Sequence, residues 1–277
     1  MRIAPITASR FISDGGAMFG LVPKPIWSTL IIPNDENGIP QNATSLLIEL
    51  DDGRKGLVET GCGSSTLFTE KEQVLHGLDK VWPLKERLQK LMISFESIDF
   101  VILTHLHWDH VGGTQSPGHQ LNFPNADHYV HTLEWEDATS GNTLLYKSYP
   151  PSILSPFKHI DQNKFHLITD THPEILPGIK LIRTGGHTRG HSMVLFDGAP
   201  IIVNHPDADK LGSPQQAIFA GDVCPTQHHL RLVFQTAYDT YPLDTRSWKQ
   251  EWLPRIAQEN VLLFFLMIQR SMEALLI

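Results

Sequence analysis

The sequence predicts an α/β protein in which two β-sheets pack together and helices cover them on the outside. Short runs rich in β-branched and aliphatic residues recur along the chain, each bounded by Gly, Pro, Asn or Asp. Helical patterns are fewer and are interspersed among these runs. No repeat, low-complexity tract or linker divides the 277 residues. Many strands with interspersed helices favour a layered architecture, and we expect a single domain over residues 1–277.

The expected strands are Thr44–Leu50, Gly56–Thr60, Asp99–His105, Ile179–Thr184, Ser192–Asp197, Pro200–Asn204, Ala217–Asp222 and the apolar run ENVLLFF at 259–265. A helix is expected at Pro83–Met92, because Pro suits its first position and apolar residues follow at helical spacing. Two more helices are expected at Thr132–Thr139 and Thr245–Asn260, the latter kinked at Pro254. The polar interval Gly118–His172 is weakly patterned and is predicted to form loops over a site.

Composition excludes several classes of function. Hydrophobic content of 41% and charged content of 19% are ordinary for a soluble globular protein. The net charge of -8, with no basic cluster, predicts neither a nucleic-acid nor a membrane partner. Two cysteines cannot form a disulfide framework, and the N-terminus lacks the apolar core of a signal peptide, so we expect a cytoplasmic protein.

The central motif is THLHWDHVGG, Thr104–Gly113, which directly follows an apolar strand. In an extended segment alternate side chains share a face, so His105 and His107 are expected to point the same way. If the chain then turns, Asp109 and His110 can reach a neighbouring point. Imidazole and carboxylate groups suit Zn²⁺ and similar divalent ions. A histidine-rich turn without metal is the alternative, but four such ligands at one strand end favour a metal site.

Two further segments carry ligand types at strand ends. GGHTRGHS, 185–192, places His187 and His191 in a glycine-rich turn, and AIFAGDV, 217–223, places Asp222 where a buried run ends. Each is weak alone, because an Asp at such a position is often a turn or cap residue. Together the three segments predict a site with two neighbouring cations, between which Asp222 could act as a bridge.

With these motifs the chain resembles the metallo-β-lactamase superfamily, in which HLHWDH, GHTRGH and GD would be the successive segments that supply metal ligands. The segments Asp14–Trp27, Gly221–His229 and Tyr238–Thr245 resemble its branch of N-acyl homoserine lactonases, which are quorum-quenching enzymes. The resemblance spans about Asp14 to Phe265. It implies an αββα sandwich with two metal ions, expected to be Zn²⁺, at one edge of the two sheets.

The resemblance also implies roles for individual residues. One metal would be bound by His105, His107 and His191, the second by Asp109 and His110, and Asp222 would bridge them, while His187 would stabilise the turn. A metal-bound hydroxide would open a lactone or related ester, and Asp109 would be the catalytic proton shuttle. The expected partner is a small-molecule substrate, and a homodimer stays open. Thioester, phosphotriester or β-lactam hydrolysis on the same site are the alternatives.

Several other residues have both a functional and a structural interpretation. Glu59 is either a support for the metal ligands or a solvated strand-end glutamate. One of His228 and His229 could face the pocket, and Cys224 is expected to be a small buried residue. Apolar core is the safer interpretation of a further set that could instead line an acyl pocket: Met18, Phe19 and Trp27.

The resemblance leaves two positions unfilled. Homoserine lactonases often have a tyrosine shortly after the bridging aspartate, but here Val223–Pro225 contains none, which puts homoserine lactone as the substrate in doubt. Relatives also supply a last histidine after a final apolar strand, and here LMIQ, 266–269, stands in its place. The second metal site is therefore expected to be weak, and a degenerate, weakly active metal-binding homologue is a further alternative.

The codons of Met-Ile-Gln suggest a reason for the missing histidine. If the reading frame begins one base earlier, the shifted codons must include one for Asp. The codon before it encodes His if the codon of Leu266 ends in C, and the codon after it encodes Pro if the codon of Ile268 also ends in C. We therefore hypothesise a frameshift or mis-splicing near Phe265–Leu266, which would make 266–277 a non-native tail.

Overall fold

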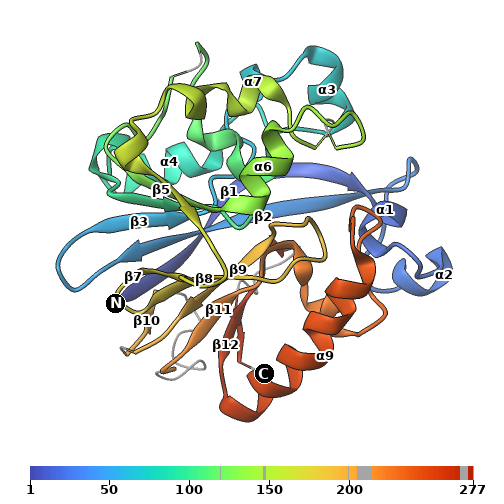
Figure 1. The fold of residues 1–277 in the computed structure, drawn as a ribbon. Helices are drawn as coiled ribbons and strands as arrows, with labels where there is room; N and C mark the ends of the chain where they lie inside the picture. Colours follow the sequence, from blue (N-terminus) through green and yellow to red (C-terminus); the bar gives the residue numbers. More distant parts are fainter. Residues whose placement is uncertain (119, 146–147, 199, 205–213, 269–273, 277) are drawn as a thin grey trace.

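Two β-sheets form the centre of the protein, as a computed structural model shows (Figure 1). The structure describes residues 1–118, 120–145, 148–198, 200–204, 214–268 and 274–276. In the first sheet the strand order is β10 (Ile202–Val203), β1 (Arg2–Asp14), β2 (Gly38–Glu49), β3 (Lys55–Val58), β4 (Phe100–Ile102), β5 (Asp127–His131) and β6 (Phe165–Ile168), with β13 (Met267–Ile268) beside β2. In the second sheet it is β14 (Ala274–Leu276), β12 (Leu262–Phe264), β11 (Ala217–Phe219), β9 (Ser192–Phe196), β8 (Ile179–Arg183) and β7 (Glu174–Leu176).

Alternation along the strands divides the core into three layers. In β9, Val194 and Phe196 face the space between the sheets, whereas Met193 and Leu195 belong to a cluster on the outer side of the second sheet. In β4, Phe100 and Ile102 likewise pack between the sheets. Strands that are apolar on both faces must be covered on both, which is why helices are needed outside the sandwich.

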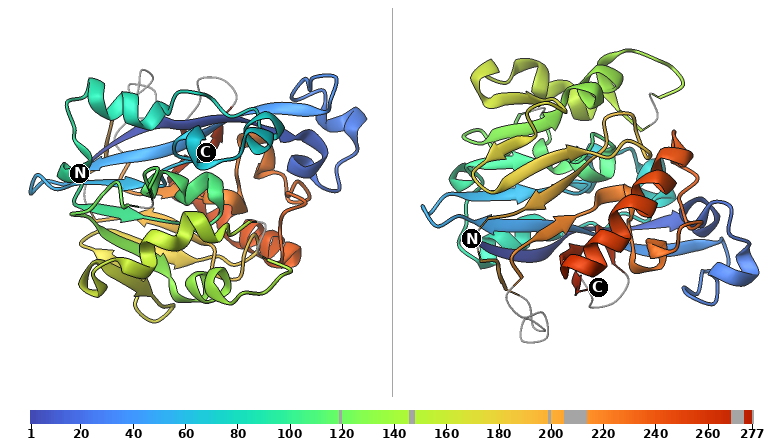
Figure 2. Two further views of the ribbon diagram at one scale, coloured as in Figure 1. Left: turned by 90° about the horizontal axis from the view of Figure 1, so that it is seen from above. Right: turned by 60° about the horizontal axis from the view of Figure 1, so that its bottom comes forward.

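The helices supply that cover. They are α1 (Gly15–Phe19), α2 (Lys24–Trp27), α3 (Glu70–Leu75), α4 (Pro83–Lys90), α5 (Trp108–Val111), α6 (Thr132–Thr139), α7 (Pro151–Leu154) and α9 (Pro242–Glu259). Figure 1 shows α4, α6 and α7 over the first sheet, and Figure 2 shows α9 across the second. Leu84 and Leu88 of α4 pack on the first sheet, and Trp248 and Ile256 of α9 on the second. The expected αββα sandwich is thus confirmed.

Two expectations about local structure are wrong. The long first strand β1 was not expected, because a bulge between Thr7 and Ser9 interrupts its alternation. Apart from the expected helix α6, the interval Gly118–His172 also contains β5, α7 and β6, so it is more than loops. The strand β5 has the polar sequence DHYVH, yet its His128 is fully buried. Its polar composition therefore did not indicate a strand that lies between β4 and β6. Helix α9 runs on through Pro254.

The segment expected to be a non-native tail begins inside the fold. Leu266 and Met267 are buried, and Met267 pairs with Ala43 of β2. Residues 269–273 and 277 of this segment lie outside the described residues. Among the helices that the structure describes, none combines the length and the apolar character needed to span a bilayer.

Candidate metal centre

The predicted ligands come together where loops leave both sheets. His105 and His107 follow β4, and Asp109 and His110 lie on the short helix α5 directly after them. The loop between β8 and β9 contributes from the second sheet, as does the 3-10 helix η6 (Gly221–Val223), which carries Asp222 just after β11. Residues far apart in the sequence therefore converge at one edge of the sandwich.

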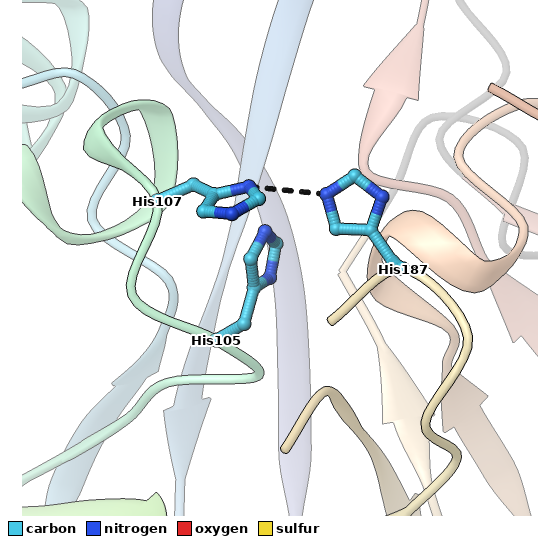
Figure 3. Close-up of side chains that lie close together, drawn as sticks. All are labelled: His105, His107 and His187. Carbon is cyan, nitrogen blue, oxygen red and sulfur yellow. Dashed lines mark hydrogen bonds between the residues drawn. The ribbon is translucent and has the colours of Figure 1, made fainter. Parts of the chain in front are cut away.

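Three histidines form the first group of candidate ligands. His105, His107 and His187 each place one ring nitrogen within 4.8 Å of the other two (Figure 3). The Nε2 atom of His187 is 3.1 Å from Nδ1 of His107, and the two rings come from facing loops. Three imidazole nitrogens that converge in this way match the ligand set of a zinc ion.

The second group shares a member with the first. His105, His110 and Asp222 also place their ligand atoms within 4.8 Å of one another. The Oδ2 atom of Asp222 lies 3.5 Å from Nε2 of His110 and 3.2 Å from Nε2 of His187. This carboxylate therefore lies between the two groups. Asp109 lies beside them, with its Oδ2 atom 3.8 Å from Nε2 of His110.

The structure brings His187 into the cluster in the place expected for His191. The Nδ1 atom of His187 is 3.0 Å from the carboxylate of Asp239, which leaves Nε2 to face the other ligands. Both nitrogens of His191 are already engaged. Its Nδ1 lies 2.6 Å from the hydroxyl of Thr184, and its Nε2 accepts the backbone N–H of Asp222 at 2.9 Å. His191 therefore orients Asp222 and has no lone pair left for a cation.

Gly221 makes this contact between His191 and Asp222 feasible. Its backbone is in the left-handed region, with φ of 57°, and a Cβ atom would come within 2.6 Å of Nε2 of His191. Glycine is the residue that tolerates both conditions.

Glu59 contacts the candidate ligand His110, so it is not the solvated strand-end glutamate that was the alternative. It is fully buried, its Oε2 atom is 3.2 Å from Nδ1 of His110, and its Oε1 atom accepts the N–H of Thr104 at 2.8 Å. Asp239 and Glu59 thus play equivalent parts for His187 and His110. A histidine that binds metal through one nitrogen is commonly fixed by a carboxylate at the other.

The donor atoms fit a pair of cations. Among the described residues, three buried atoms of the cluster have no hydrogen-bond partner: Nε2 of His105, Nε2 of His110 and Oδ1 of Asp222. Buried polar atoms are rarely left without a partner. Burial lowers the pKa values of His105 and His107 well below the ordinary value, so both rings keep a free lone pair.

The charges of the candidate ligands also favour bound cations. Burial opposes a charge on His110, but Asp109, Asp222 and Glu59 together raise its pKa well above the ordinary value. Burial likewise opposes ionisation of Asp222, yet the charges of His110 and His187 lower its pKa overall. Positive charge at this point therefore stabilises the cluster, and divalent ions would supply it in place of a proton on His110.

The cluster opens into a cavity of about 570 Å³. His107, Asp109, His187 and Asp222 lie at its base, and Met267 also lines it. Its apolar wall is formed by Phe11, Ile12, Met18, Val74, Leu75 and Trp108. A volume of this size suits a small organic molecule.

The remaining candidates divide between cavity and core. Met18 lines the cavity, whereas Phe19 and Trp27 are buried against each other with stacked rings. His229 is buried and its Nε2 lies 2.9 Å from the carbonyl oxygen of Met18, so it braces this wall from outside. His228 is half-buried and is not among the residues that line the cavity. Cys224 is a buried residue of the cluster beneath α9, as expected.

Sequence reasoning missed Asp239 and Tyr238, which are adjacent in the chain. Tyr238 lines the cavity, and burial together with the nearby charges of Asp109, Asp14 and Asp222 raises its pKa to about 12. A tyrosine is thus present at the site, although the segment directly after Asp222 has none. The only signal was the resemblance of the segment that begins at Tyr238 to lactonases.

The family model that matches this chain is that of the metallo-beta-lactamase superfamily, over residues 38–203. The chain belongs to this superfamily. Curated relatives are N-acyl homoserine lactonases: that of a Bacillus species is 27% identical over 159 residues, 54% of this chain and 56% of the relative. That of Bacillus thuringiensis is 25% identical over 187 residues, 63% of this chain and 68% of the relative. The first match therefore spans only about half of the relative's length.

Solved structures share the fold over nearly the whole chain. A probable metal-dependent hydrolase from Staphylococcus aureus superposes with a TM-score of 0.82 and 27% identity, covering 96% of this chain and 88% of that one. A dizinc quorum-quenching lactonase, in complex with its product, superposes with a TM-score of 0.71 over 98% of this chain and 88% of that one. Its 16% identity bears on the fold alone.

Proposed function

We propose that this protein is a metal-dependent hydrolase that opens a lactone or related ester in the cavity above the histidine cluster. The observation that carries the proposal is the convergence of two ligand groups on the carboxylate of Asp222, with lone pairs left unused at the base of a cavity. The names of the curated relatives support a lactone as the substrate.

We assign the ligands from the geometry described above. His105, His107 and His187 would bind one cation, Asp109 and His110 the other, and Asp222 both. Divalent cations bound there supply Lewis acidity and an activated water molecule near neutral pH. This assignment replaces His191 with His187 and leaves His191 to orient Asp222 through its backbone N–H.

The chain's own groups would perform the remaining tasks. Burial raises the pKa of Asp109, so this carboxyl group is suited to take up a proton and pass it to a leaving alkoxide. The hydroxyl of Tyr238, whose raised pKa keeps it protonated, can donate a hydrogen bond to the substrate carbonyl. The apolar wall around Trp108 would bind the hydrocarbon part of the substrate.

Metal content and turnover test the proposal together. Purified protein, stripped with a chelator and reloaded with Zn²⁺ or Mn²⁺, would be assayed with acyl homoserine lactones, simple lactones, a thioester, a phosphotriester and a β-lactam. We expect lactone turnover that requires metal and is abolished in His187→Ala. His228→Ala is the matched control, because that half-buried histidine is not among the residues that line the cavity.

Two results would contradict the proposal in different ways. Bound metal together with turnover of another substrate class, but of no lactone, would overturn the substrate assignment. Fewer than one bound cation per chain in the reloaded protein would overturn the metal centre itself and favour a degenerate homologue. Loss of turnover in His191→Ala with full metal content would agree with the orienting role of that residue.

A further inference from the structure

The side chain of Glu134, on α6, is a buried carboxylate that the proposed chemistry does not use. It is fully buried and accepts three hydrogen bonds. Its Oε1 atom accepts the backbone N–H of Leu106 and the hydroxyl of Tyr149, each at 2.9 Å. Its Oε2 atom accepts the hydroxyl of Thr188. A buried carboxylate is costly unless such donors surround it, so this arrangement calls for an explanation.

Each of the three donors lies next to a histidine of the first ligand group. Leu106 stands between His105 and His107 in the chain, so its N–H fixes the loop that carries both rings. Thr188 directly follows His187. The ring of Tyr149 packs 4.9 Å, centroid to centroid, from the ring of His107. One carboxylate thus joins the loop after β4, the loop between β8 and β9, and the segment at Tyr149.

The rest of α6 fixes the same turn from outside. A Cβ atom on Gly190 would lie only 2.1 Å from the backbone nitrogen of Glu134, so the turn rests directly on the helix. The guanidinium of Arg189 pairs with Asp137 at 2.7 Å and with Glu136 at 3.0 Å. The position of Glu134 relative to the 187–191 turn is therefore defined by packing as well as by hydrogen bonds.

We propose that Glu134 is a positioning residue that holds the two ligand loops at the separation required by the first metal ion. The 3.1 Å approach of His107 to His187 joins loops from different sheets, and Glu134 is bonded to both of them. Without its carboxylate, each loop would have to be ordered when the metal binds, which would lower the affinity. The inference rests on the proposed metal centre.

Variants at Glu134 separate hydrogen bonding from charge. Glu134→Ala removes all three bonds, and we expect Zn²⁺ affinity, measured by competition with a chromophoric chelator, to fall about tenfold or more. Glu134→Gln keeps an oxygen for Leu106 and Tyr149, and the hydroxyl of Thr188 can turn to accept from the amide. We expect its affinity to stay within about threefold of the wild type. Glu251→Ala, at an exposed glutamate on α9 outside the ligand loops, is the matched control and should leave the affinity unchanged.

Hydrogen–deuterium exchange of metal-free protein supplies a second measurement. We expect residues 104–110 and 185–191 to exchange faster in Glu134→Ala than in the wild type or Glu251→Ala. If Glu134→Ala does not fold, Thr188→Val removes one bond and should weaken Zn²⁺ binding, while Thr188→Ser, which keeps the hydroxyl, should restore it.

Wild-type affinity in Glu134→Ala, or equal losses in Glu134→Gln and Glu134→Ala, would overturn the inference. A wild-type protein that binds no Zn²⁺ would overturn the metal centre instead. In that case the exchange comparison would still decide whether Glu134 orders the two loops.

Discussion

Replacing Asp239 with Asn tests the assignment of His187 as a metal ligand. The side chain of Asp239 is almost fully buried and its Oδ1 atom lies 3.0 Å from Nδ1 of His187. The same carboxylate accepts the hydroxyls of Thr236 at 2.8 Å and Thr245 at 2.9 Å. Asn preserves the volume but removes the negative charge and turns one acceptor into a donor. The His187 ring would then lose the charged partner that fixes its tautomer and orientation, because an amide oxygen is a weaker acceptor than a carboxylate.

The expected loss of metal affinity in Asp239→Asn follows from this hydrogen-bonding pattern. Removing the outer partner of a metal-binding histidine typically weakens metal affinity by about 10- to 100-fold. That range corresponds to about 1.4–2.7 kcal/mol of binding free energy. Since the fold of the loop also depends on Thr236 and Thr245, whose hydroxyls can reorient toward an amide, we expect the variant to remain folded.

Competition with a chromophoric chelator measures the loss. Asp170→Asn is a matched control, because Asp170 also pairs with a histidine, His131, at 3.3 Å but lies outside the site. Thr184→Val removes the partner of His191 and should cost less affinity than Asp239→Asn. Unchanged affinity in Asp239→Asn, or a larger loss in Thr184→Val, would refute the assignment of His187 and point back to His191.

Four further predictions concern the cavity, the coding sequence and the core. Met267 lines the cavity at the position where a last histidine is expected, so Met267→His should raise the number of bound cations per chain; unchanged metal content would count against this. Sequencing the coding region tests the proposed frameshift, which codons ending other than in C at Leu266 and Ile268 would refute. Tyr238→Phe should lower kcat for a lactone by at least about tenfold with metal content unchanged, and an unaltered kcat would exclude the hydroxyl from the reaction. Burial lowers the pKa of His128 from 6.5 to about 4, so its proton binds more tightly to the unfolded chain. Stability should therefore fall as the pH drops from 6.5 toward 4, by up to about 1.4 kcal/mol per pH unit, and His128→Gln should reduce that slope in urea titrations.

Regular apolar patterns predicted most of the secondary structure that builds the fold. Strands with an irregular or polar sequence were not predicted. Helix α6 begins and ends at the residues expected, Thr132 and Thr139, and β8 and β9 match within one residue at each end. In β8 the buried residues Ile179 and Leu181 follow the two-residue period of a strand, and in β9 four apolar residues follow one another. The strand β1 was missed because its bulge breaks that period, and β5 because His128 is buried in it. Neither the bulge in β1 nor the burial of His128 can be recognised from the neighbouring residues in the sequence.

The sequence by itself indicated the family and the candidate ligands that share one short segment. His105, His107, Asp109 and His110 are adjacent in the chain, so the geometry of a strand end suffices to bring them together. The choice between His187 and His191 as the candidate ligand depends on the tertiary structure. His187 and His191 lie four residues apart in one turn, and their surroundings distinguish them: Asp239 binds one ring, and the N–H of Asp222 occupies the other. Those partners are 52 and 31 residues away in the chain, and only packing of the folded sheets places them there.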